Sequence, residues 1–331
     1  MRSRVFAVLM SISLLVATAV SSPAQIAPEK PMLSGKGMKS KLGLVYLGGN
    51  SPGLQMLLER GRIPIIKLGV GDFGGPNSVG HRLKQKNPRA IIFVGAGISS
   101  KELRPDRDPA EVFNGWLKAQ EGNLRVYQAN SKLIDYLSFM PNMWEPKTVE
   151  IAQWYCRYVT YAAPRIAQMG FRPIILQSGV GGLPIEPQIL DAMVPAFRVA
   201  KRYGGAWACH GYTLEYTKDA RVESFYSLRY RKAYEYLRKA HPNVADLTMI
   251  LMEAGVDKAG DPDKDGWQAR GTKEKYIDWL TWFDAELCKD PQVLGAALFA
   301  IGCGSGWKSF DVEPITGWLA DYWDRKAASV K

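Results

Sequence analysis

The chain has 331 residues, with 43 Lys and Arg against 32 Asp and Glu, and a formal net charge of +11. A hydrophobic fraction of 47% and a charged fraction of 23% are typical of a folded globular protein and exclude a disordered or fibrous chain. Three histidines, and four cysteines without a CxxC pair, give little basis for a histidine-built metal centre or a structural zinc site, so we expect no metal and no cofactor.

The first 24 residues have the pattern of a secretory signal peptide. Arg2 and Arg4 precede an apolar run over residues 5–20, and small residues then lead to the polar Gln25. The apolar run is shorter than the roughly 20 residues that a membrane-spanning helix needs, although an uncleaved anchor is the alternative. We therefore expect a protein that is secreted or lies in the periplasm or cell envelope.

Residues 25–41 are rich in Pro, Gly, Ser and Lys, which is typical of a flexible linker. This basic arm and the signal peptide together carry five of the eleven net positive charges, which leaves +6 for residues 42–331. A balance of that size does not point to nucleic acid. The arm could instead make a peripheral contact with an anionic cell envelope. The sequence does not indicate the oligomeric state.

From residue 42 onward, short apolar runs alternate with longer stretches of helical period. The eight runs predicted as strands are 42–47, 63–68, 90–94, 134–140, 173–177, 207–212, 247–253 and 293–301. The stretches predicted as helices are 52–60, 109–120, 147–169, 187–203, 222–240, 272–289 and 314–327.

This alternation indicates a parallel sheet with crossover helices. Eight units within residues 42–331 favour a single-domain (β/α)₈ TIM barrel, with an open doubly wound sheet as the alternative fold. In such a barrel the chemistry lies where the strands end, at the C-terminal face. The candidate site residues are therefore expected at those strand ends.

Four strand ends carry polar or aromatic residues of interest. Glu253 closes the otherwise apolar seventh strand, where burial of a carboxylate is costly unless something compensates it. His210 and Tyr212 on the sixth strand share one face. Residues 142–145, which read Asn-Met-Trp-Glu, follow the fourth strand, and Trp307 stands in a glycine-rich loop after the eighth.

Together these segments resemble the clan of retaining β-glycosidases built on (β/α)₈ barrels, over roughly residues 42–325. Members of that clan carry Asn-Glu after strand four, His-x-Tyr on strand six, Glu on strand seven and Trp after strand eight. The stretches around residues 253–257, 282–286, 295–299 and 307–311 are similar to a bacterial branch of uncharacterised secreted members.

The resemblance implies a role for each of these residues. Glu253 would be the nucleophile and Tyr212 its hydrogen-bond partner. The substrate would be bound by Asn142, His210, Tyr212, Trp307 and Trp144, although some of the ten tryptophans must serve packing. Such catalysis also needs a second carboxyl group, roughly 5 Å from the first, to protonate the leaving oxygen.

The chain departs from the clan pattern at that second carboxyl group. Met143 follows Asn142 where the clan has Glu, and Glu145 is the next carboxylate. An insertion or bulge could bring Glu145 to the acid position, or the acid is lost and the protein is a catalytically impaired carbohydrate-binding barrel. Glu145 could also simply cap the following helix. The two expectations are thus a retaining glycoside hydrolase acting on a polysaccharide or glycoconjugate, and a binding barrel of the cell envelope.

Two further patterns point to other ligands. Asp261, Asp263 and Asp265 before Gly266 match the first half of a calcium loop, but Thr272 stands where the closing Glu belongs. Basic residues interleaved with tyrosines over residues 221–241 could bind nucleic acid. However, the tyrosine spacing is helical and predicts rings that face the core, so we expect no nucleic-acid partner.

Overall fold

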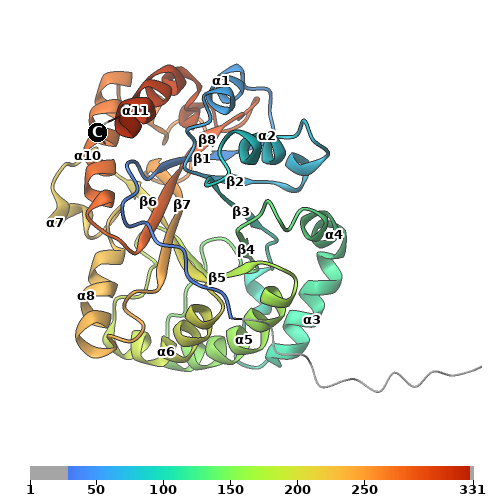
Figure 1. Cartoon of the computed structure of the whole chain (residues 1–331). Helices are drawn as coiled ribbons and strands as arrows, with labels where there is room; N and C mark the ends of the chain where they lie inside the picture. The colour runs from blue at the N-terminus through green and yellow to red at the C-terminus, as the bar shows by residue number, and fades with distance from the viewer. Residues whose placement is uncertain (1–28, 329–331) are drawn as a thin grey trace, which may run out of the picture.

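The computed structural model describes residues 29–328, so the predicted signal peptide lies outside the described residues. Eight parallel strands close into a barrel in chain order, from β1 next to β2 around to β8 next to β1 (Figure 1). The predicted single (β/α)₈ barrel is confirmed. The strands are β1 Leu42–Tyr46, β2 Ile65–Leu68, β3 Ile91–Gly95, β4 Tyr136–Ser138, β5 Arg172–Ser178, β6 Ala206–Thr213, β7 Thr248–Val256 and β8 Val293–Ile301.

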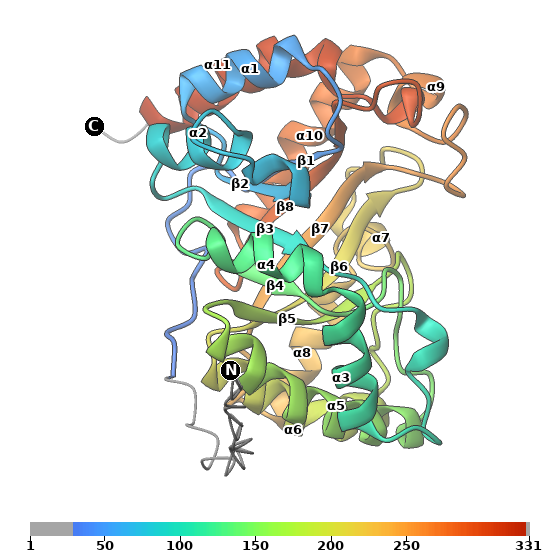
Figure 2. The ribbon, with the colours of Figure 1, turned by 90° about the vertical axis from the view of Figure 1, so that its right-hand side faces the viewer.

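Helices surround the barrel between successive strands (Figures 1 and 2). They are α1 Pro52–Arg60, α2 Val79–Lys86, α3 Pro109–Ala119, α4 Glu121–Ala129, α5 Val149–Gln168, α6 Pro187–Arg202, α7 Ala220–Glu223, α8 Tyr230–Ala240, α9 Trp267–Arg270, α10 Lys273–Cys288 and α11 Thr316–Ala328. Within residues 29–328, no helix is long and apolar enough to cross a membrane.

The observed helices differ from the predicted ones in two ways: some short helices were not predicted, and one predicted helix is divided. The short helices α2, α4 and α9 were not predicted; α2 buries little beyond Leu83, so its apolar pattern is weak. The single helix expected over residues 222–240 is two helices. The buried Glu223 carboxylate accepts hydrogen bonds from Thr213 (2.7 Å) and Ser227 (2.6 Å), which ties the end of α7 to β6 before α8 begins.

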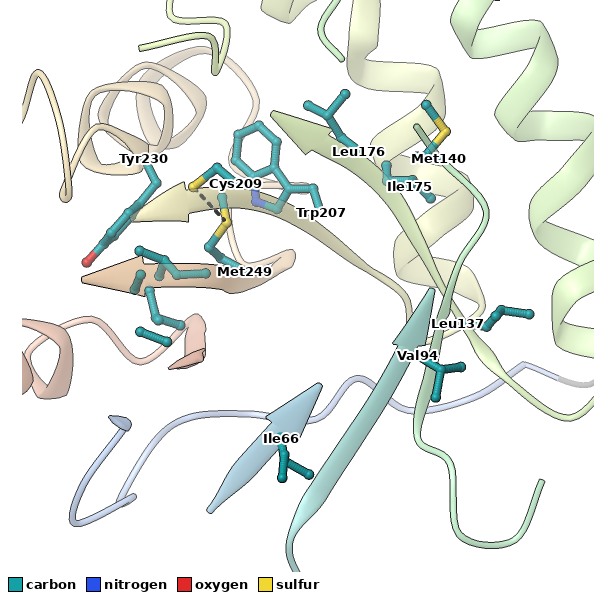
Figure 3. Packing of buried hydrophobic residues seen from close by; sticks show 14 of the residues in the cluster. Ile66, Val94, Leu137, Met140, Ile175, Leu176, Trp207, Cys209, Tyr230 and Met249 are labelled. Atoms are coloured by element: carbon teal, nitrogen blue, oxygen red, sulfur yellow. Dashed lines mark hydrogen bonds between the residues drawn. The ribbon is translucent and has the colours of Figure 1, made fainter. Parts of the chain in front are cut away.

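The core has two layers because successive side chains of a strand point to opposite faces. One cluster fills the barrel and includes Ile65, Phe93, Tyr136 and Met252. The other lies between the strands and the helices. Figure 3 shows part of this outer cluster, in which Ile66, Val94, Leu137, Leu176 and Trp207 are labelled on their strands. A polar side chain on an inward position therefore lies inside the barrel, among the apolar residues of the interior cluster.

The described part of the basic arm, residues 29–41, lies across the end of the barrel at which the strands begin (Figure 2). The Gly35 amide donates to the Pro291 carbonyl (3.0 Å), and Thr248 Oγ1 donates to the Leu33 carbonyl (2.9 Å). The Lys41 amide donates to Asp284 Oδ1 (2.6 Å). These contacts cover the N-terminal pole, and the mouth lies at the opposite, C-terminal end of the strands.

Candidate active site

A β-bulge in β7 directs Glu253 into the barrel. Ala208 and Cys209 of β6 pair with Ile250 and Leu251, but the next residue, His210, pairs with Glu253. One extra residue of β7 is therefore inserted here, and β8 shows the same shift on the other side. Both Met252 and Glu253 consequently reach the interior, which simple alternation would forbid.

The strand does not end at Glu253 as its sequence predicted, but continues to Val256. Gly255 adopts a φ of 138°, a conformation open to glycine alone. The carboxylate is thus held within a paired strand, not at a free end. Its side chain is only 11% exposed.

Three groups surround the Glu253 carboxylate. Lys67 Nζ on β2 donates to Oε1 at 2.8 Å, and Tyr212 Oη on β6 donates to Oε2 at 3.3 Å. His210 Nδ1 lies 3.7 Å from Oε2. Glu253, His210 and Tyr212 were predicted as neighbours, and they lie together in the structure. Lys67 was not predicted, although it is a cation two residues after the inward-facing Ile65 in an otherwise apolar strand.

The electrostatics of this cluster favour an ionised carboxylate beside a neutral imidazole. Burial alone would raise the pKa of Glu253, but the charge that His210 carries once it is protonated at low pH, the Lys67 charge, and the hydrogen bonds from Lys67 and Tyr212 outweigh it and hold that pKa below its usual range. Burial also lowers the pKa of His210. Since a neutral imidazole carries no charge, Lys67 is the cation that balances Glu253 at neutral pH.

A chain of hydrogen bonds continues from His210 toward β4. His210 Nε2 lies 3.0 Å from Asn142 Oδ1, which also accepts from Gln177 Nε2 at 2.6 Å. Gln177 Oε1 in turn accepts from the buried Ser138 hydroxyl at 3.0 Å. Asn142, predicted as a substrate contact, is exposed at the mouth and joined to His210. Gln177 was not predicted, although it is a polar residue near the end of the largely apolar strand β5.

The segment that follows Asn142 turns away from this chain of contacts. Met143 has a φ of 54° and is 62% exposed, with its side chain next to Gly179. The Trp144 amide donates to the Gln177 carbonyl at 3.0 Å. The Trp144 ring packs on Tyr155 with centroids 5.3 Å apart and is 9% exposed. In this conformation Trp144 therefore contributes mainly to packing.

Glu145 lies over the loop between β5 and α6. A Cβ placed on Gly182 would lie 2.7 Å from its Oε2, so the carboxyl packs directly against this glycine and would have to shift if the residue carried a side chain. Lys147 Nζ is 4.0 Å from Oε1, and the hydrogen bonds and ion pairs that hold Glu253 do not include Glu145. Burial raises the pKa of Glu145, although the Lys147 and Arg229 charges oppose the rise.

Trp307 stands at the opposite side of the mouth, after β8. Its φ of 53° turns the chain sharply into the short 3₁₀ segment Lys308–Phe310. The half-buried indole packs edge-on against Phe299 (5.0 Å between centroids) and Phe310 (5.5 Å). These contacts fix the ring as part of the interior cluster while one part of it stays accessible.

The carboxylates of the calcium-like loop hydrogen-bond to their own backbone. Asp265 Oδ2 accepts from the Asp261 amide at 2.9 Å, and Asp261 Oδ1 accepts from the Asp263 amide at 2.9 Å. Across the part of the chain that the structure describes, no group of three or more His, Cys, Asp or Glu side chains is arranged to hold a metal ion. The loop is thus a hydrogen-bonded turn.

No protein-family model matches the chain, and no curated protein matches its sequence. Among solved structures, a β-glucuronidase of Bacteroides uniformis is 11% identical with a TM-score of 0.43, over 78% of this chain and 30% of that one. An endo-1,4-β-D-mannanase of Thermotoga petrophila is 10% identical with a TM-score of 0.46, over 86% and 99%. A D-psicose 3-epimerase of Clostridium cellulolyticum is 11% identical with a TM-score of 0.45, over 88% and 99%.

The chain therefore spans about a third of the length of the β-glucuronidase. At these identities and TM-scores, the similarity carries no argument about activity. The barrel itself is established by its own strand pairing.

Proposed function

We propose that the chain acts on carbohydrate at the C-terminal mouth of the barrel, as a glycoside hydrolase that retains configuration. Glu253 is the nucleophile in this proposal. The observation that carries it is the environment of Glu253: a buried carboxylate kept ionised by Lys67 and Tyr212, on an inward position created by a bulge. Asn142 and His210 offer hydrogen-bonding groups beside it, and Trp307 offers a ring.

The opposite pKa shifts of two carboxyl groups support the assignment of roles. A retaining mechanism needs one carboxylate that attacks the anomeric carbon and one carboxylic acid that gives its proton to the leaving oxygen. Glu253 has a lowered pKa and Glu145 a raised one, which suits them to these two roles. We assign the acid and base role to Glu145, with the segment 141–146 bringing it inward when substrate binds.

In the first step Glu253 forms an ester bond to the anomeric carbon as the glycosidic bond breaks, and the leaving oxygen takes the proton of Glu145. In the second step water attacks the same carbon, gives its proton to Glu145, and the ester bond to Glu253 breaks. Both carboxyl groups return to their starting states. We also propose that this reaction takes place outside the cytoplasm, as the N-terminal sequence pattern suggests.

A second function, carbohydrate binding without hydrolysis, is favoured by one observation. The Glu145 carboxyl lies against Gly182 and near Lys147, while the exposed Met143 occupies the position next to Asn142. If segment 141–146 keeps this conformation with substrate present, no acid reaches the glycosidic oxygen. Sugars would then be held by the same polar groups and released unchanged.

A panel of aryl and oligomeric β-glycosides tests both functions with wild type, Glu253→Gln and Glu145→Gln. Hydrolysis predicts a loss on the order of 10⁴-fold for Glu253→Gln and of about 10²–10⁴-fold for Glu145→Gln. Glu121→Gln, an exposed helix residue paired with Arg125, is the matched control and should stay at wild-type activity. Activity that is unchanged in Glu253→Gln would overturn the hydrolase proposal. Binding of a glycan without turnover by any variant would support the second function.

Azide separates the acid from a merely structural role for Glu145. In Glu145→Ala, azide attacks the anomeric carbon of the glycosyl ester, breaks its bond to Glu253 and needs no general base. We expect partial rescue and a glycosyl azide of retained configuration. A variant that is folded, inactive and not rescued would remove Glu145 from the acid and base role.

A further inference from the structure

We infer that the N-terminal pole of the barrel carries a binding site for a phosphate-type anion, separate from the mouth. A cavity of about 720 Å³ lies between the basic arm and the barrel at this pole. Residues of the arm form one wall, the loops that precede β2 and β3 form the floor, and the end of α11 closes it. Its charged lining residues are Lys36, Lys39, Arg62, Arg89 and Lys326.

The charge of this lining has one sign. All five charged residues that line the cavity are cations, and no carboxylate lines it. Arg62 pairs with Asp324 at 3.1 Å and Lys326 with Asp284 at 3.6 Å, both outside the lining. Asp324 is also shared with Arg60 at 2.7 Å, so it only partly offsets Arg62.

The other three cations keep their full charge for a ligand. The side chains of Lys36, Lys39 and Arg89 are exposed and form no ion pair with any described residue. Like charges that converge on one cavity repel each other, and an anion between them removes that cost while it gains charge-assisted hydrogen bonds. A phosphate group suits this lining because it offers up to two negative charges and several acceptor oxygens.

A buried donor in the same wall also lacks an acceptor. Trp323 lines the cavity and is 3% exposed, and its indole N–H has no hydrogen-bond partner among the described residues. A buried donor without an acceptor costs free energy. This N–H is itself covered by protein atoms, so it is a cost in the wall of the cavity and not a contact that the anion makes in this conformation.

The site depends on the basic arm, which supplies part of its lining. Residues 34–40 contribute two of the three unpaired lysine and arginine side chains, and the arm is fixed at both sides by the Leu33 and Lys41 contacts. The site thus forms only when the arm lies across the pole. It would take a phosphate group either from a small soluble molecule or from the headgroup of an anionic lipid.

Binding to the full chain at low ionic strength tests the site, with three probes: inorganic phosphate, pyrophosphate, and vesicles of phosphatidylglycerol against vesicles of phosphatidylcholine. We expect calorimetric binding of a soluble probe or sedimentation with the phosphatidylglycerol vesicles, weakened by salt. Binding of the soluble probes identifies a small phosphate compound as the ligand source. Binding of the vesicles alone identifies a lipid headgroup.

The variant Arg89→Ala should weaken binding at least about tenfold, since it removes one charge-assisted hydrogen bond. Arg89→Gln is the second variant in case the alanine disturbs the loop, and Lys39→Ala repeats the test on the arm. Lys273→Ala, at the start of α10, is the matched control and should bind as wild type does. No binding of any of the three probes, or equal losses in the Lys273 and Arg89 variants, would overturn the proposal.

Discussion

Lys67 on β2 and Glu253 on β7 form an ion pair inside the mouth of the barrel, with Nζ and Oε1 2.8 Å apart. Neither strand is a neighbour of the other in the sheet, so this contact joins side chains across the barrel interior. Both side chains are largely shielded from solvent, at 22% and 11% exposure. The pair therefore influences both the stability of the barrel and the charge state of its candidate nucleophile.

Lys67→Met should destabilise the protein by about 1–3 kcal/mol, because it leaves the Glu253 carboxylate without its cation. Urea denaturation measures this loss. The double variant with Glu253→Gln should recover part of it, since no uncompensated charge then remains. If the loss of stability in the double variant equalled the sum of the losses in the two single variants, the two residues would not be coupled.

The stability difference between wild type and Glu253→Gln should shrink as the pH falls. The pKa of Glu253 is lower in the folded chain than the value of about 4.3 for an unfolded one, so ionisation stabilises the folded state above that value. This contribution is lost as the pH drops through the folded pKa. Denaturation of both proteins between about pH 7 and pH 3 checks it, and a difference that grows toward low pH would contradict it.

His210 should remain neutral down to a lower pH than an ordinary histidine does. Burial lowers its pKa below 6.5, and its Nε2 lies 3.0 Å from an acceptor oxygen of Asn142. We therefore expect the tautomer with hydrogen on Nε2. With three histidines in the chain, ¹⁵N spectroscopy of labelled imidazoles can assign each signal through single substitutions. A His210 signal that titrates at or above 6.5 would contradict the expected burial effect.

Gly255→Ala should destabilise the protein by about 1–3 kcal/mol, because a φ of 138° strains any residue with a side chain. The added Cβ would also lie 3.1 Å from the Tyr276 hydroxyl oxygen. Gly97→Ala is the matched control, since a Cβ there meets nothing within 4 Å. Equal thermal midpoints for the two variants would show that the backbone after the bulge carries no strain.

The barrel could be predicted because each strand is a short apolar run and because apolar residues recur at helical spacing in each major helix. The eight predicted strands match the eight observed ones to within a few residues at their ends. The short helices α2 and α4 could not be predicted in the same way, since few of their residues are buried and the apolar pattern is weak.

The candidate site was predictable only where one strand carries the signal. His210 and Tyr212 share a face of β6, and Glu253 interrupts an apolar run, so each stands out in the sequence. The partnership of Glu253 with Lys67 depends on closure of the barrel, which brings β2 near β7, and no local pattern encodes that closeness. Alternation likewise could not reveal the bulge that turns Glu253 inward.

The most direct test of the proposed nucleophile is covalent trapping, followed by the intact mass of the full chain. Activated 2-deoxy-2-fluoro glycosides of several β-configured sugars form the glycosyl ester but release it slowly. We predict a mass increase of one fluorosugar with at least one probe, located on the peptide that contains Glu253 and absent in Glu253→Gln. Turnover of a β-glycoside with the label on another residue, or no label from any probe on a protein that binds the same sugars, would contradict the assignment.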